Sequence, residues 1–332
     1  MRSTPLAGVG KPIAALSGAA LMLLLFPLRS VGIPTAPQAT EELEEIVIQA
    51  LEPRYVAPTR RDRIGRIWAP VLINGKGPFR MVLDTGANRS GVTSDVAEAL
   101  GLPPDASRQV MLRGVTGSAT VPTIQVDSLT VGDLLLTPVT LPIVNDALGG
   151  AQGILGTEGL RDKRIYIDFH NDLISISRSK NEPAHLGFVT IQLEHPETGL
   201  LTFHAMVGTV RVLAIIDTGG QATIGNEAMR AALERRSAVG DHEEIEGVTT
   251  AVQSVEGFRS PRILLGDLEV QGERISYGDM HIFEHWHLTQ EPALLIGMDT
   301  LGLLDTFIID YHRHELQLRV RETVSNSFVR GS

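Results

Sequence analysis

Short apolar runs separated by Gly, Pro, Asn and Asp dominate this chain, a pattern that predicts many short strands joined by tight turns. The clearest hairpin signal lies between Val71 and Asp84, because Asn74-Gly75 interrupts two apolar segments. A second stretch of the same kind extends from Ala205 to Asp217. Each stretch ends in an unbroken apolar run, which indicates a last strand buried in the core.

Two short helices are expected, one after each hairpin. Ser94 is placed to cap the first, which continues through Leu100 and ends at Gly101. Asn226 is placed to cap the second, which continues through Leu233. Strands dominate the remainder, and we expect them at 124–126, 131–139, 164–177, 263–265 and 307–319.

The same landmarks occur twice along the chain, in the same order and at nearly constant separation. They are Asp84 with Asp217, Gly114-Val115-Thr116 with Gly247-Val248-Thr249, Gly132-Asp133-Leu134 with Gly266-Asp267-Leu268, Leu155-Gly156 with Ile296-Gly297, and Asp168 with Asp310. This order indicates a tandem duplication. The Gly-Asp-Leu copies are interpreted as hairpin turns, and Asp168 and Asp310 as structural residues at strand ends.

The repeat divides the chain into segments whose boundaries follow turns and polar stretches. The predicted segments are a signal peptide or anchor at 1–32, a linker with a short acidic helix at 33–62, an N-terminal lobe at 63–182, a C-terminal lobe at 183–324 and a tail at 325–332. The length of 332 residues suits two domains of ordinary size.

Composition narrows the possible functions. The hydrophobic content of 43% and the charged content of 20% are typical of a globular protein with a core. The chain has no Cys, which excludes disulfides, thiol catalysis and zinc–thiolate sites. The net charge of −10, with no basic stripe, argues against a nucleic acid as partner.

The first 32 residues have the pattern of an export signal. Arg2 and Lys11 precede a nearly continuous apolar run at 13–28, and Ser30 and Gly32 match the small residues of a cleavage site. A cleaved signal peptide, an uncleaved membrane anchor and a buried first helix all agree with this pattern. We therefore expect a periplasmic or extracellular protein with a possible membrane tether through residues 13–28.

The repeated tripeptide at Asp84-Thr85-Gly86 and Asp217-Thr218-Gly219 carries the chemistry. Two carboxylates within hydrogen-bond reach share one proton, so one can activate a water while the other donates to a carbonyl oxygen. Thr85 and Thr218 can hydrogen-bond across to the opposite half, and Gly86 and Gly219 allow backbone N–H groups to approach the carboxylates. No nucleophile elbow and no phosphate-binding glycine loop is present.

The chain resembles the aspartic peptidases, in both their retroviral-type and pepsin-like branches. The resemblance rests on Leu83 to Ala87 with Ile154-Leu155-Gly156, and on Ile216 to Gly219 with Leu295-Ile296-Gly297. It covers roughly residues 65 to 320. Its implied fold is mostly β: two homologous retropepsin-like β-barrel lobes in one chain, with an active-site cleft between them.

The resemblance also implies a function. The chain is expected to be an aspartic endopeptidase, active as a monomer on a peptide or protein substrate, with Asp84 and Asp217 catalytic and no metal or organic cofactor. Thr85, Gly86, Thr218 and Gly219 would support the catalytic pair. Two flap segments would cover the substrate, namely Gly114-Val115-Thr116 and Gly247-Val248-Thr249.

The sequence departs from the family pattern in three places. Ala87 follows the first motif as in the retroviral branch, but Gly220 follows the second, where the family more often has Ala, Ser or Thr. The flap tyrosine of pepsin-like enzymes is missing, since no Tyr lies between Tyr55 and Tyr166. We expect a working pH range less acidic than that of pepsin-like enzymes.

Other interpretations of these features remain open. Both Asp residues can be turn residues at strand ends, or the fold can bind peptides without cutting them. Two chains can also pair equivalent lobes to build the site. His281, His285 and His287 have a spacing that a metal could use, although their segment is more typical of strand or loop packing.

Overall fold

In the computed structural model, the described residues are 55–58, 65–145, 149–194, 199–233, 241–246 and 252–320. All belong to one compact unit. The predicted signal or anchor segment at 1–32 and the tail at 325–332 lie outside them. Within the described part of the chain, no helix has both the length and the apolar character needed to cross a bilayer.

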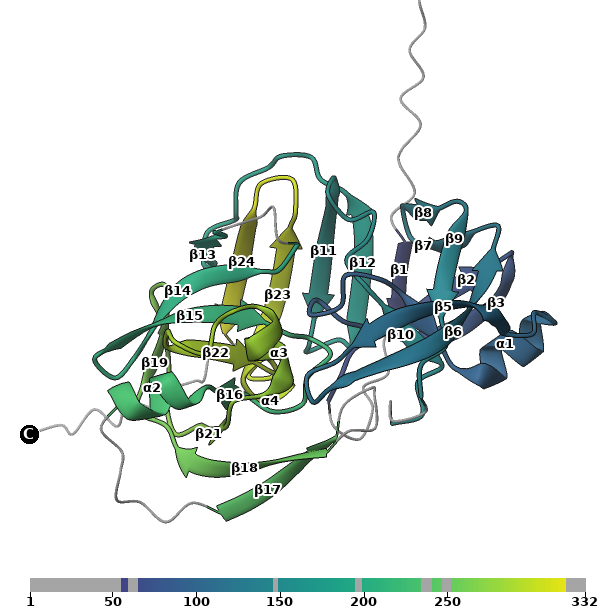
Figure 1. Ribbon diagram of the computed structural model, residues 1–332. Helices are drawn as coiled ribbons and strands as arrows, with labels where there is room; N and C mark the ends of the chain where they lie inside the picture. Colours follow the sequence, from purple (N-terminus) through teal and green to yellow (C-terminus); the bar gives the residue numbers. More distant parts are fainter. Residues whose placement is uncertain are drawn as a thin grey trace, which may run out of the picture. The chain divides into compact units, whose positions relative to one another are not determined.

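The fold is mostly β, as the sequence predicts (Figure 1). The strands of the first half, residues 65–182, are β2 (Trp68–Ile73), β3 (Lys76–Leu83), β4 (Gly91–Val92), β5 (Asp105–Arg113), β6 (Ser118–Val126), β7 (Leu129–Val131), β8 (Leu134–Leu136), β9 (Val139–Pro142), β10 (Gly153–Leu155), β11 (Lys163–Asp168) and β12 (Leu173–Arg178). Its one described helix is α1 (Ser94–Leu100).

The second half, residues 183–320, repeats most of this series. Its strands are β13 (Val189–Gln192), β14 (Thr202–Val207), β15 (Val210–Ile216), β16 (Ile224–Gly225), β17 (Asp241–Glu246), β18 (Val252–Arg259), β19 (Ile263–Leu265), β20 (Leu268–Val270), β21 (Arg274–Tyr277), β22 (Ala293–Ile296), β23 (Leu304–Asp310) and β24 (Glu315–Val320). Its described helices are α2 (Glu227–Ala232), α3 (His281–His285) and α4 (Met298–Leu301).

Sheet topology shows the same repeat. The first half has a sheet of order β4-β10-β3-β2-β7-β8, and the second half has the corresponding order β16-β22-β15-β14-β19-β20. The hairpin β5-β6 pairs with β9, and the hairpin β17-β18 pairs with β21. The predicted turns at Asn74-Gly75, Asp133 and Asp267 connect the strands as expected, with Asn74 and Gly75 both at positive φ.

A separate six-stranded sheet joins the two halves. Its order is β1-β12-β11-β23-β24-β13, in which β11 and β23 pair directly across the predicted lobe boundary. The strand β1 (Tyr55–Pro58), which falls in the predicted linker, forms one edge of this sheet. The largest hydrophobic cluster likewise includes residues of both halves, so the halves share a core.

The two predicted helix starts have different outcomes. Asn226 caps α2 as predicted, since its side chain accepts a hydrogen bond from the Met229 N–H at 2.9 Å. The prediction for α1 is wrong, because Ser94 is its first helical residue and Thr93 is the N-cap. Thr93 has the extended backbone of a cap, with φ −74° and ψ 162°, although its side chain makes no capping hydrogen bond.

Candidate active site

Asp84 and Asp217 directly follow β3 and β15, two equivalent strands. Each is held from behind by a buried central strand, because the Asp84 N–H donates to Leu155 O and the Asp217 N–H donates to Ile296 O, both at 3.0 Å. The strands β10 and β22, which supply these carbonyls, run parallel to β3 and β15 and are buried along their whole length. The two apolar-plus-glycine motifs therefore anchor the two Asp-Thr-Gly loops.

The two carboxyl groups meet across the pseudo-symmetric interface and hydrogen-bond to each other. Each loop holds its own carboxylate in the same way. Oδ1 of Asp84 accepts from the N–H groups of Gly86 at 2.9 Å and Ala87 at 3.1 Å. Oδ1 of Asp217 accepts from Gly219 at 2.9 Å and Gly220 at 3.0 Å. These backbone bonds therefore engage Oδ1 of each carboxyl group and not Oδ2.

Thr85 and Thr218 lock the two loops together, as the sequence predicts. Each backbone N–H donates to the hydroxyl of the other threonine at 3.1 Å. The Thr85 hydroxyl donates to Ile216 O at 2.8 Å, and the Thr218 hydroxyl donates to Leu83 O at 2.6 Å. All four bonds are buried and cross between halves, so they set the separation of the two carboxyl groups.

Glycine is required where the loops approach the carboxyl groups. A Cβ added at Gly219 would lie 2.7 Å from Oδ1 of Asp84 and closer still to two further atoms of that carboxyl. At Gly86 the nearest contacts would be 3.2 Å, with Asp217. At Gly220 a Cβ would lie 2.8 Å from Oδ2 of Asp217, which explains locally why this position departs from the family pattern.

The environments of the two carboxyl groups differ. Burial, followed by the charge of Asp217, raises the pKa of Asp84 to about 8. Burial also raises the pKa of Asp217, but the Gly220 and Gly219 N–H groups, the hydrogen bond with Asp84 and the charge of Arg66 oppose this. Asp217 therefore releases its proton first, and Asp84 retains the proton that the pair shares.

A second layer of polar residues supports both loops in the same way. In the first half, Gly156 N–H donates to Ser90 Oγ at 3.1 Å, and Ser90 N–H donates to Glu158 Oε1 at 2.8 Å. In the second half, Gly297 N–H donates to Thr223 Oγ1 at 3.2 Å, and the Thr223 hydroxyl donates to Asp299 Oδ1 at 2.6 Å. The acidic residues thus tie each catalytic loop to its anchoring segment.

Sequence analysis missed these acidic residues and one arginine. A signal for the first two exists, because Glu158 and Asp299 each lie two residues after the anchoring glycine of their half. Arg66 has no such signal, since its counterpart in the second half is Leu200. Arg66 is only 6% exposed and lines the cleft together with Asp84 and Asp217.

Asp84 and Asp217 open into a cleft of about 1440 Å³ that both halves line. This volume is large enough for several residues of a peptide. Residues of the β5-β6 hairpin line it from the first half, among them Gly114 and Val115 at the hairpin tip. Thr116 is buried and does not line it, whereas Gly247, Val248 and Thr249 lie outside the described residues.

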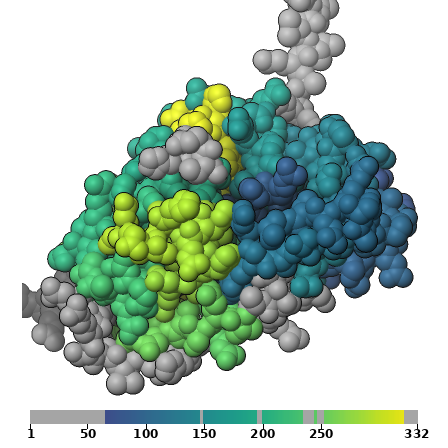
Figure 2. Space-filling model, viewed as in Figure 1, coloured from purple at the N-terminus to yellow at the C-terminus, as the bar shows by residue number. Residues whose placement is uncertain are grey.

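The tip of the β5-β6 hairpin contacts α3 of the second half. Ile282 N–H donates to Val115 O at 3.2 Å, and Ser118 Oγ and His281 Nε2 are 2.7 Å apart. In Figure 2 the blue residues of this hairpin meet the yellow-green residues around α3 across one face of the molecule. The hairpin therefore bridges the two halves above the cleft.

The histidine segment forms a short helix rather than the strand or loop expected. His281 hydrogen-bonds to the hairpin, and His285 lines the cleft. Among the described side chains, no group of three or more His, Asp or Glu residues could hold a metal ion. His312 and His314, at the turn between β23 and β24, are exposed.

Asp168 and Asp310 are structural, as predicted. Oδ1 of Asp168 accepts from two backbone N–H groups that follow β11, and Oδ1 of Asp310 accepts from the Arg313 N–H at 3.1 Å.

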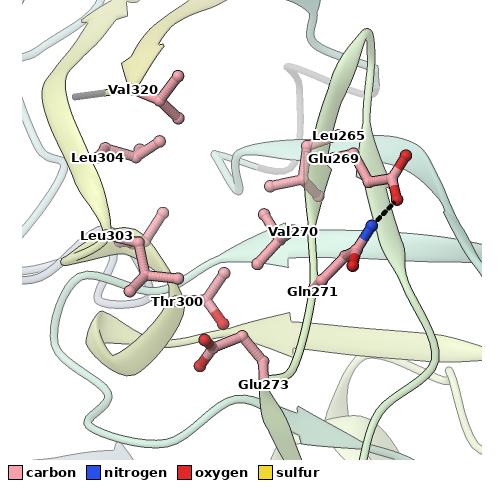
Figure 3. Close-up of a pocket in the computed structure, with 10 residues that line it drawn as sticks. Leu265, Glu269, Val270, Gln271, Glu273, Thr300, Leu303, Leu304 and Val320 are labelled. Carbon is pink, nitrogen blue, oxygen red and sulfur yellow. Dashed lines mark hydrogen bonds between the residues drawn. The ribbon is translucent and has the colours of Figure 1, made fainter. Parts of the chain in front are cut away.

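A smaller cavity of about 220 Å³ lies in the second half, where Leu303 and Leu304 face Leu265 and Val270 (Figure 3). Neither Asp84 nor Asp217 lines it, so the large cleft is the candidate site.

A mostly β chain that brings two Asp-Thr-Gly carboxyl groups together at a cleft has the architecture of an aspartic peptidase. In agreement, residues 69–158 match the family model described as aspartyl protease. The fold also resembles the crystal structure of aspartic proteinase from Irpex lacteus, with a TM-score of 0.50 and 11% sequence identity. That match covers 82% of this chain and 99% of the other.

No curated protein matches the chain in sequence. The family match and the shared fold confirm the resemblance to the aspartic peptidases. The family match falls within the first half, which holds Asp84 and its anchoring segment. A peptidase-type hydrolase is therefore the function class that the comparisons support.

Proposed function

We propose that this chain is an aspartic endopeptidase that hydrolyses peptide bonds with a water activated between Asp84 and Asp217. The observation that carries the proposal is the contact between two carboxyl groups, each oriented by two backbone N–H groups, at the floor of a peptide-sized cleft. A pair of structural turn residues would not need a shared proton or an open cleft.

The different environments of the two carboxyl groups give Asp84 and Asp217 different roles in proton transfer. Ionised Asp217 takes a proton from the water, and the water oxygen attacks the carbonyl carbon of the substrate. Protonated Asp84 donates to the carbonyl oxygen as the tetrahedral intermediate forms. The C–N bond then breaks as Asp217 gives its proton to the leaving nitrogen and a hydroxyl of the intermediate returns a proton to Asp84. The products are a carboxyl group and an amine, and the pair again holds one proton. No covalent intermediate with the chain is required.

Digestion of a random peptide library, followed by mass spectrometry, tests this proposal directly. We expect new termini to appear, because the oriented carboxyl pair should turn over and not only bind. A peptide with a tetrahedral hydroxyl carbon in place of the scissile carbonyl should block cleavage, since it mimics the intermediate that the pair stabilises.

Titration with that analogue controls for contaminating peptidases. The end point should equal the molar concentration of this chain. Peptide binding without new termini would contradict the endopeptidase and favour a silent binding module. An end point far below the chain concentration would assign the cleavage to another protein.

The raised pKa of Asp84 predicts a specific pH dependence of activity. Because the pair must keep one proton, cleavage should persist near neutral pH and fall as pH rises through about 8. A pH profile of kcat/KM on one peptide measures this. A maximum in strong acid, below about pH 3, would contradict the expectation, since both carboxyl groups would then be protonated.

The free energy of unfolding should depend on the same titration of Asp84. The ordinary pKa of Asp84 is 3.8, so the unfolded chain releases a proton that the folded chain retains up to about pH 8. The stabilisation from this group is therefore complete below about pH 4 and is lost as pH rises to about 8. Urea unfolding across this range should show a larger loss in the parent than in Asp84→Asn, where only Asp217 still has a raised pKa.

A further inference from the structure

The two halves of the cleft carry different charges although their backbones correspond. Leu83 N–H donates to Ile67 O at 2.9 Å, and Ile216 N–H donates to Leu201 O at 3.0 Å, so Ile67 and Leu201 are equivalent. Their neighbours Arg66 and Leu200 both line the cleft. A cation of the first half thus corresponds to an apolar residue of the second.

Arg89 repeats this asymmetry. Gly156 packs against the backbone of Arg89, and Gly297 packs against the backbone of Ala222, so these two positions are equivalent as well. Both residues line the cleft. Arg89 is exposed and forms no salt bridge within the part of the chain that the structure describes. Its guanidinium group is therefore available to a ligand.

Arg113 adds a third cation at the covering hairpin. It is the last residue of β5, is exposed, and lines the cleft. Burial, followed by the charge of Arg113, lowers the pKa of His285 on α3, so the guanidinium group lies near this second lining residue of the cleft. No described carboxylate forms a salt bridge with Arg113.

Acidic residues of the cleft, apart from the catalytic pair, lie in the second half. They are Glu244 on β17 and Glu291 after α3. Cations therefore line one half and carboxylates the other, in a chain whose net charge is −10. Because a cleft concentrates the field of the charges that line it, this separation discriminates between charged substrates and orients them.

We propose that the cleft selects peptides that carry an acidic side chain, and that Arg89 and Arg113 are specificity-determining residues that bind its carboxylate. Guanidinium groups bind carboxylates through charge-assisted and often bidentate hydrogen bonds. Arg66 is buried and its charge lowers the pKa of Asp217, so we do not assign it to substrate binding. This inference rests on the proposed function, because it concerns the substrate of the same cleft.

Peptide libraries with one position fixed as Glu, Gln or Lys test this inference. At the peptide position whose side chain reaches Arg89 and Arg113, the parent should cleave Glu peptides with a kcat/KM about tenfold higher than that for Gln peptides. This is the difference expected for one charge-assisted contact. In the double variant Arg89→Ala/Arg113→Ala the two peptides should be cleaved equally, because Ala222 already occupies the position equivalent to Arg89. The parent's preference should also weaken with added salt.

Arg108→Ala is the matched control. Arg108 lies on the same strand, pairs with Asp105 at 3.5 Å and does not line the cleft, so the Glu preference should persist. Equal cleavage of Glu and Gln peptides by the parent at every position would overturn the inference. So would a preference for Lys, or a Glu preference that survives in the double variant.

Binding of the same fluorescent peptides to the full chain carrying Asp84→Asn separates this inference from the proposed function. Tighter binding of Glu than of Gln peptides, lost on adding Arg89→Ala and Arg113→Ala, supports the inference even if the parent cleaves nothing. If the parent cleaves peptides, but binds and cleaves Glu and Gln peptides equally, the proposed peptidase activity stands and the proposed preference for acidic peptides is wrong.

Discussion

Replacing either Asp84 or Asp217 with Asn should lower kcat/KM by about 10³-fold or more, because each carboxyl performs one half of the proton transfer. Asn preserves the shape and most hydrogen bonds at either position. It cannot accept a proton from water at position 217 or donate a carboxyl proton at position 84. Steady-state cleavage of one library-derived peptide measures the loss.

Folding of these variants must be measured together with activity. We expect the thermal midpoint to stay equal or rise at neutral pH, since Asp217→Asn removes a buried charge and Asp84→Asn replaces a carboxyl group that is already neutral. Asp267→Asn is the matched control, because Asp267 lies in an exposed turn of the second half and does not line the cleft. Its activity should equal that of the parent.

Mixing the two inactive variants distinguishes an active site built within one chain from an active site built by two chains. The structure brings both carboxyl groups together within a single chain, so Asp84→Asn mixed with Asp217→Asn should stay inactive. Recovery of activity on mixing would mean that equivalent halves of two chains build the site. Substantial activity in either single variant would contradict the paired mechanism itself.

Adding one methyl group at Gly219 should lower kcat/KM by about 10²-fold or more. The new Cβ of Gly219→Ala would overlap the Asp84 carboxyl, which must then move from its position beside Asp217. A displacement of about 1 Å at a catalytic group is enough for a loss of this size. Steady-state kinetics with the same peptide measures the effect.

Gly86→Ala provides the matched comparison at the equivalent position. Its Cβ would meet Asp217 and Asp84 at 3.2 to 3.3 Å, so a small shift of the loop relieves the contact. We expect a loss of about tenfold or less in kcat/KM. Equal losses in the two variants would show that the loops are symmetric in solution and that the tighter approach at Gly219 has no consequence.

The repeat and the meeting of Asp84 with Asp217 could be predicted from the sequence because their signals are local. Asp-Thr-Gly, the apolar strand before it and the apolar-plus-glycine segment that anchors it each occupy a few consecutive residues. Their recurrence in the same order predicted the correspondence that the strand order of the two central sheets shows. The crossed threonine bonds followed from the same symmetry.

Features that depend on distant contacts could not be predicted. The five-residue helix α3 is too short for a periodic pattern, and it packs beside the hairpin tip that arrives from the other half. The cap of α1 was misassigned because Thr93 and Ser94 are both good capping residues, and only the backbone conformation distinguishes them.

The sequence by itself determined which residues carry the proposed chemistry: two carboxyl groups, two threonines and the glycines beside them, each in a repeated local motif. Only the tertiary structure decided that Asp84 retains the shared proton, that Arg66 acts on Asp217, and that cations gather on one half of the cleft. The physical reason is that burial and charge interactions depend on distances through space. Residues far apart in the chain set those distances, whereas a turn or a buried strand is set by its own neighbours.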